Sequence, residues 1–127
     1  VISRDSSSGT YEVFEETVMH GKDMASHVEY VGTNPQAHAR ISETRGAIGY
    51  VGYGFLDRKV KTIELDDVKP NRRTIATGDY PIARPLYLFT NGYPELGSLT
   101  HEFCSFYLTE EGQSIIEEKG FVPLTDY

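Results

Sequence analysis

The chain has 127 residues, which is the length of one ordinary domain. Its composition, with 39% hydrophobic and 24% charged residues, is typical of a globular protein rather than a disordered or fibrous one. No apolar run approaches about 18 residues, so no membrane span is expected. The formal net charge of −7 argues against a nucleic-acid binder, which needs a basic face, and against long-range attraction of anions. One cysteine, Cys104, excludes an internal disulfide and a cysteine-based zinc site, and no cofactor is expected.

The first part of the chain predicts a strand followed by a helix. Residues 1–4 have the character of a short buried strand, and a strand at the first residue indicates a processed chain or a piece of a longer one. A helix is expected to open at Gly9 or Thr10 and to stop at Gly21, before a polar, turn-rich stretch at residues 22–35. Its apolar positions recur at helical spacing: Tyr11, Phe14 and Val18.

The middle of the chain alternates helices and strands. A second helix is expected over residues 36–43. Residues 47–53 and 59–65 have the β-branched, aromatic or alternating character of strands. Pro70 suits the first turn of a short helix, and Gly78 lies past its end.

The last part predicts one strand and two helices. Residues 84–90 are a strand candidate, and residues 94–107 carry apolar side chains at helical spacing. Thr109 is the expected N-cap of a final helix, which ends at Lys119 and Gly120 before an extended tail at 121–124. This alternation predicts an α/β class.

The segment between the first strand and the first helix carries the chemistry. The first turn of a helix offers unpaired N–H groups and a partial positive charge, and Gly9 permits close approach of a ligand. Ser8 and Thr10 add hydroxyl donors, and the fork of Arg4 matches two oxygens of a tetrahedral anion. The sequence therefore predicts an anion site at residues 4–10. The alternative is a serine-rich loop that only caps the helix, and the acidic Glu12 would repel an anion unless it points to solvent.

Three stretches resemble the phosphate-binding proteins of ABC transporters, the PstS-like family. R-D-S-S-S-G-T-Y-x-x-F, which begins at Arg4, resembles the family's signature, and residues 46–51 resemble its G-A-I-G-Y strand. Residues 80–87, together with 111–113 and 120–124, resemble its Y-P-I-x-R-P-L-Y and E-G-Q…G-[FY]-V-P-L ending. The resemblance covers nearly the whole chain.

The resemblance implies a type II periplasmic-binding-protein-like fold, in which two α/β lobes close on the ligand. It implies phosphate binding by Arg4, Ser8, Gly9 and Thr10. By the same comparison, residues 1–79 form most of the ligand-binding second lobe, and residues 80–127 return to the first lobe. The family's other ligands, including a carboxylate that accepts the proton of hydrogen phosphate, come from a first-lobe segment that has no counterpart here.

The implied function is the substrate-binding component of an ABC importer, not an enzyme, with inorganic phosphate and the transporter permease as partners. The missing first-lobe segment or a second chain is a further expected partner. The location is extracytoplasmic, periplasmic or at the cell surface, with any lipid anchor in a region absent here. The alternatives are a binder of sulfate, molybdate or tungstate, and a regulatory or adhesion module. A phosphate-handling hydrolase lacks a recognisable nucleophile or metal set.

One departure from the family pattern concerns the arginine. Family members often carry an acid two residues after it, where this chain has Ser6, and the acid here is the adjacent Asp5. Because neighbouring residues on a strand point to opposite faces, the sequence leaves open whether Asp5 pairs with Arg4.

Overall fold

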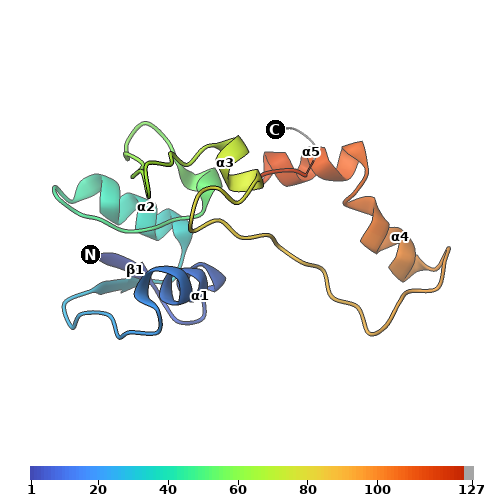
Figure 1. Ribbon diagram of the computed structural model, residues 1–127, viewed down its shortest axis with the longest axis horizontal. Coiled ribbons are helices and arrows are strands. Elements are labelled where there is room, and N and C mark those ends of the chain that lie inside the picture. Colours follow the sequence, from blue (N-terminus) through green and yellow to red (C-terminus); the bar gives the residue numbers. More distant parts are fainter. Residues whose placement is uncertain (125–127) are drawn as a thin grey trace.

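The computed structural model describes residues 1–124, and its N-terminal part is built on a small parallel sheet (Figure 1). Strand β1 (Ile2–Arg4) pairs in parallel with β2 (Glu29–Val31), with Arg4 opposite Val31. All three residues of β1 are buried, whereas β2 is more exposed. Burial therefore centres on the strand that ends at Arg4.

Helices follow each strand. Helix α1 (Gly9–Phe14) continues into a π-helical turn, η1 (Glu15–Met19), which ends at His20 in a left-handed conformation. Helix α2 (Asn34–Glu43) follows β2 and begins in a capping box between Thr33 and Gln36. Side chains at the starts of α1 and α2 thus satisfy backbone N–H groups that each helix leaves unpaired.

Tyr50 joins β1 to the first helix. Its hydroxyl lies 2.7 Å from Ser3 Oγ and accepts from the backbone N–H of Arg4 at 3.2 Å. Its ring stacks on Phe14, with centroids 4.2 Å apart. Tyr50 and Ile2 are among the buried hydrophobic residues, so this contact helps to fix both sides of the strand-to-helix turn.

Removal of the Tyr50 hydroxyl tests this link. Tyr50→Phe is expected to lower the free energy of unfolding by about 1–2 kcal/mol. The ring still packs, but the buried Arg4 N–H loses its acceptor and Ser3 Oγ keeps only its bond to the Arg4 carbonyl. Urea denaturation monitored by circular dichroism measures the change. An unchanged midpoint would show that the hydroxyl does not hold β1.

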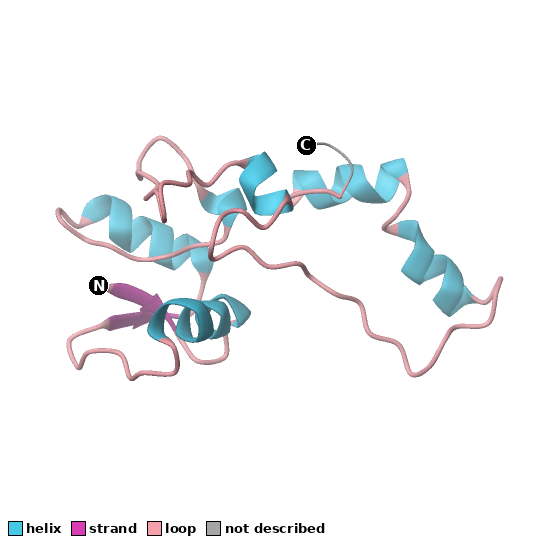
Figure 2. Ribbon diagram, in the orientation of Figure 1, coloured by secondary structure: helices cyan, strands magenta, loops and turns pink. Residues whose placement is uncertain are grey.

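The second half contains short helices and long loops (Figure 2). It comprises the 3₁₀ turn η2 (Tyr53–Phe55), α3 (Arg72–Ala76), α4 (Leu99–Phe106) and α5 (Glu110–Glu118). Residues 80–98 leave the body as an extended arm, and α5 returns beside α3 (Figure 1). Arg72 Nη1 on α3 donates to Glu117 Oε1 on α5 at 2.5 Å, which ties the returning end to the body.

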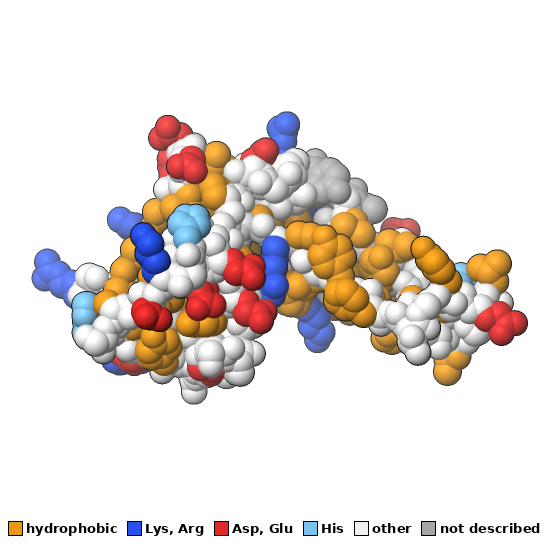
Figure 3. All heavy atoms as spheres, turned by 60° about the horizontal axis from the view of Figure 1, so that its bottom comes forward, with side chains coloured by type: hydrophobic (Ala, Val, Ile, Leu, Met, Phe, Trp, Pro, Cys, Tyr) orange, Lys and Arg blue, Asp and Glu red, His pale blue; other side chains and the backbone are white. Residues whose placement is uncertain are grey.

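The arm and α4 expose many large apolar side chains, and hydrophobic atoms cover much of this part of the surface in Figure 3. Their exposed fractions lie between 56% and 104%. The residues concerned are Leu86, Tyr87, Leu88, Phe89, Tyr93, Leu96, Leu99 and Phe103. Such a surface is typical of a segment that packs against another part of a protein.

Fewer of the predicted strands than of the predicted helices are present in the structure. The strand at residues 1–4 is confirmed as β1, but residues 47–53 make only one isolated bridge, between Gly49 and Ile2. The strands predicted at 59–65 and 84–90 are wrong for this structure. Within residues 1–124 the first segment makes only an isolated bridge, between Leu65 and Val68, and the second pairs with no other segment. Strand β2 was not predicted, since it has only three residues and lies in a polar, turn-rich stretch of the chain.

The predicted helices all form, with shifted boundaries. The helix expected at 36–43 begins at Asn34, and the final helix is capped by Thr109 as predicted. The helix expected at 94–107 begins only at Leu99. Gly97 adopts a left-handed conformation and Ser98 Oγ accepts from the backbone N–H of His101, so the chain turns before this helix starts.

No helix within residues 1–124 is long and apolar enough to cross a membrane.

Candidate anion-binding site

Ser8 is the N-cap of α1, at the turn where β1 gives way to the helix. Its hydroxyl oxygen accepts from the backbone N–H groups of Thr10 at 3.2 Å and Tyr11 at 3.4 Å, and the residue is 7% exposed. Its own backbone N–H donates to the Asp5 carbonyl. The predicted ligands Ser8, Gly9 and Thr10 therefore lie together at one helix start.

The first turn of α1 keeps donors available. Within the described part of the chain, the backbone N–H of Gly9 donates to no protein acceptor. Glu12, the acid of this turn, is exposed to solvent. The helix start thus presents an unpaired N–H and a partial positive charge without a buried carboxylate of its own.

Arg4 is nine-tenths buried at the end of β1, with 9% of its surface exposed. Its Nη2 donates to the carbonyl oxygen of Gly32 at 2.9 Å, just beyond the end of β2. Its Nε is buried and has no hydrogen-bond partner among the described residues. A buried guanidinium with an unpartnered N–H is costly unless a further acceptor is supplied.

Asp5 turns away from this pairing. Its Oδ1 accepts from the backbone N–H of Ser7 at 3.0 Å and from the Ser7 hydroxyl at 2.5 Å, and it forms no ion pair with Arg4 among residues 1–124. The Ser7 hydroxyl is the main cause that holds the pKa of Asp5 below its ordinary value, and the charge of Arg4 adds a smaller lowering. The carbonyl of Gly32, not an adjacent acid, therefore orients Arg4.

The Asp5–Ser7 contact gives a pH prediction. Because the folded state lowers the Asp5 pKa, the contact stabilises the turn above the unfolded pKa, and this stabilisation is lost as pH falls through the folded pKa. Ser7→Ala should raise the Asp5 pKa toward the ordinary value of about 3.9. NMR titration of the Asp5 carboxyl carbon measures it, and equal midpoints in the two proteins would refute the assignment.

Arg84 is a residue of this site that the sequence did not single out. A Cβ placed on Gly9 would lie 2.5 Å from Arg84 Nη2, so the guanidinium packs directly on the first residue of α1. In the sequence, Arg84 belongs to the expected strand at 84–90 and to the stretch that resembles the family ending, and neither implies a role at the helix start. No local pattern connects it to the helix start, because the contact depends on the path of the chain after α3.

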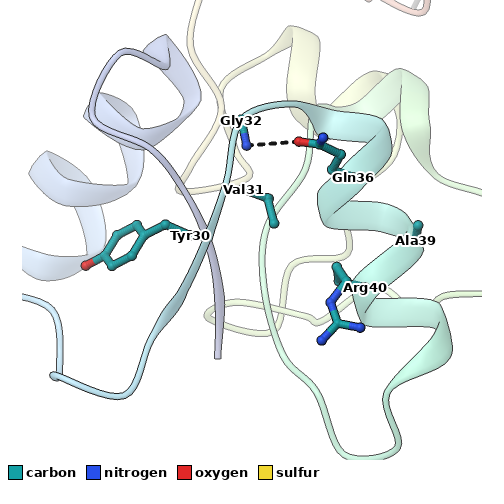
Figure 4. Close-up of a pocket in the computed structure, with 6 residues that line it drawn as sticks. All are labelled: Tyr30, Val31, Gly32, Gln36, Ala39 and Arg40. Carbon is teal, nitrogen blue, oxygen red and sulfur yellow. Dashed lines mark hydrogen bonds between the residues drawn. The ribbon is translucent and has the colours of Figure 1, made fainter.

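A hollow of about 370 Å³ is lined by Gly32 and the other residues drawn in Figure 4. The Gly32 N–H donates to Gln36 Oε1 at 3.0 Å there. The cation of the hollow, Arg40, is paired with Glu29 through two bonds of 2.6 and 3.0 Å. Since this pair neutralises the charge, the hollow is a poor anion site, and the turn at Ser8 is the better candidate.

Comparison with known proteins agrees with the architecture. The model of a PBP superfamily domain matches residues 1–111. The phosphate-binding protein PstS of Bacillus subtilis is 34% identical over 128 residues, covering 99% of this chain and 42% of the relative, and PstS of Pseudomonas aeruginosa is 30% identical, covering 98% and 41%. The crystal structure of a phosphate ABC transporter, phosphate-binding protein from Streptococcus pneumoniae superposes with a TM-score of 0.78 at 26% identity, over 99% of this chain and 51% of that one.

The chain thus spans about half of these relatives or less. The expected periplasmic-binding-protein-like fold is confirmed by the matched family model and by the structural superposition, over the part of that fold which the chain contains. On this ground the chain belongs to the PBP superfamily and is similar, along nearly all of its length, to PstS-type phosphate-binding proteins.

Proposed function

We propose that the protein containing this chain binds inorganic phosphate as the substrate-binding component of an ABC importer, and that it is not an enzyme. Arg4, Ser8, Gly9 and Thr10 hold the anion from one side. The observation that carries this proposal is Arg4, which ends the strand that leads into the helix start. Its guanidinium is nine-tenths buried, and its Nε has no hydrogen-bond partner within residues 1–124.

The chemistry of the four residues suits a tetrahedral oxyanion. The backbone N–H of Gly9, the hydroxyls of Ser8 and Thr10 and the fork of Arg4 are all donors. Ser8 already uses its oxygen as an acceptor for the helix, so its hydroxyl hydrogen is left to donate. Each hydrogen bond to a charged group contributes about 1.5–3 kcal/mol, and several together offset the cost of association.

The names of the relatives support phosphate as the ligand. PstS of Bacillus subtilis and PstS of Pseudomonas aeruginosa are named as phosphate-binding proteins, and the Streptococcus pneumoniae structure belongs to a phosphate ABC transporter. A permease partner and an extracytoplasmic location follow from that role. The same names argue against sulfate, molybdate or tungstate and against a regulatory or adhesion module.

We further propose that residues 1–79 form most of one lobe and that residues 80–127 cross to another. The arm at residues 80–98 leaves the body and its large apolar side chains are exposed, which supports a covering lobe from a first-lobe segment or a second chain. That lobe would supply the remaining ligands and the carboxylate that distinguishes hydrogen phosphate.

Competition calorimetry with the full-length protein tests the function. Phosphate is expected to bind with micromolar or tighter affinity, and sulfate in large excess is expected to leave this binding unchanged. A carboxylate in the site accepts the proton of hydrogen phosphate but repels fully ionised sulfate. Tighter binding of sulfate, or no heat with phosphate, would contradict the proposal.

A further inference from the structure

The contact between Arg84 and Gly9 explains why the first residue of α1 is a glycine. No positive φ requires glycine there, and glycine in a helix costs about 1 kcal/mol relative to alanine. The reason is space, because Arg84 Nη2 and Cζ would lie 2.5 and 3.7 Å from a Cβ at this position. The guanidinium therefore occupies the volume in which a side chain would otherwise begin.

Arg84 is exposed, so water screens its charge in part, but its guanidinium lies at the helix end that repels a cation. The start of a helix carries a partial positive charge, and Arg4 closes the strand that leads into the same turn. Arg84 forms no ion pair with any carboxylate among residues 1–124. Two acids flank Gly9 in the sequence: Asp5 is hydrogen-bonded to Ser7, and Glu12 is exposed to solvent. An anion at the helix start would relieve this gathering of positive charge.

We propose that Arg84 is a second guanidinium ligand for the bound anion, placed over the helix start by the segment that follows α3. This inference rests on the proposed phosphate function. Two arginines favour the dianion over the monoanion, so Arg84 selects for the more highly charged form of phosphate. Binding also connects the end of β1 with the chain that leads into the arm.

Phosphate titration of the full-length protein and its Arg84→Gln variant tests the proposal. The variant should bind phosphate about tenfold more weakly, because one charge-assisted interaction is lost. Between about pH 6 and about pH 8 phosphate loses its second proton, and the unaltered protein should bind it more tightly as the dianion forms. This rise in phosphate affinity should be smaller in the Arg84→Gln variant. All other residues are the same in the two proteins, so the difference between the two pH profiles isolates Arg84.

Two further variants give controls. Arg84→Lys keeps the charge and should recover the pH profile with part of the affinity. Arg58→Gln removes an exposed arginine from the turn after η2 and should change neither quantity.

The outcomes separate this proposal from the proposed function. If Arg4→Ala weakens binding while Arg84→Gln matches the unaltered protein in affinity and pH profile, the role of Arg84 is refuted and phosphate binding stands. If the unaltered protein does not bind phosphate, both are refuted. A weakened Arg84→Gln variant whose pH profile runs parallel to that of the unaltered protein would indicate a structural role and would also refute the proposal.

Discussion

Alanine in place of Arg4 is expected to weaken phosphate binding by the full-length protein about 100-fold or more, the largest effect of any single change at the site. The fork of Arg4 is the only side-chain cation among Arg4, Ser8, Gly9 and Thr10, and in the described part of the chain its buried Nε has no hydrogen-bond partner. The estimate assumes that Arg4 donates two charge-assisted hydrogen bonds to phosphate, each worth about 1.5–3 kcal/mol. A loss of about 1.4 kcal/mol of binding free energy weakens the dissociation constant tenfold. Isothermal calorimetry measures the two dissociation constants.

The controls separate ligand loss from misfolding. Arg4→Lys retains the charge but not the fork, so an intermediate loss is expected. Arg72→Ala is a matched control, since Arg72 also has buried, unpartnered guanidinium atoms but lies on α3 and pairs with Glu117. Its phosphate affinity should stay within about twofold of the unaltered protein. Equal affinities in the Arg4→Ala and unaltered proteins, both with cooperative unfolding, would contradict the role of Arg4.

Valine in place of Gly49 is expected to lower the free energy of unfolding by about 3 kcal/mol or more. A Cβ at this position would lie 2.5 Å from the carbonyl oxygen of Ile2 and 2.8 Å from Ile41 Cδ1. The first neighbour is backbone and cannot move aside without displacing β1, whose Ile2 N–H also donates to the Ile48 carbonyl at 2.8 Å. Urea denaturation measures the loss, and weaker phosphate binding should accompany it because β1 carries Arg4.

Gly52→Ala is the matched control in the same stretch. Its nearest neighbours, Asn34 Nδ2 and Phe55 Cδ2, lie at an ordinary contact distance of 3.5 Å, and its φ of −59° is open to any residue. The change should therefore alter stability by less than about 1 kcal/mol. A large loss in Gly52→Ala, or none in Gly49→Val, would show that close approach of β1 is not what selects glycine at position 49.

Helix starts could be predicted from the sequence because their causes are local. Ser8 and Thr109 each accept from backbone N–H groups two or three residues ahead. A cap residue followed by an apolar repeat is therefore enough to predict where a helix begins. The late start of α4 was not predicted. The apolar spacing extends back to residue 94, but the left-handed Gly97 and the N-cap Ser98 make the helix begin at Leu99.

Strands could not be predicted to the same degree because a strand needs a ladder partner elsewhere. Residues 84–90 have suitable β-branched and aromatic side chains, yet no described segment pairs with them and their apolar groups are exposed. Residues 29–31 form β2 because β1 lies beside them, although they are only three residues in a turn-rich stretch. Pairing across the chain, more than propensity, decided both cases.

The site divides in the same way. Ser8, Gly9 and Thr10 share one turn, and their proximity follows from sequence alone. The orientation of Arg4 by Gly32 and the contact of Arg84 with Gly9 both depend on distant parts of the chain. The net charge of −7 is no obstacle to such a site, because local dipoles and arginines act at short range where the overall field matters little.

Backbone NMR of the isotopically labelled full-length protein tests the central claim most directly. Addition of phosphate is expected to shift the amide resonances of Gly9 and Thr10 saturably, together with the Nε–H resonance of Arg4. The anion accepts from the Gly9 N–H, the Thr10 hydroxyl and the Arg4 Nε–H, whereas the Thr10 N–H, which donates to Ser8 Oγ, reports on the neighbouring hydroxyl. An equal concentration of chloride should leave all three unchanged. Phosphate binding with no change at the start of α1, or no saturable change anywhere, would contradict the account.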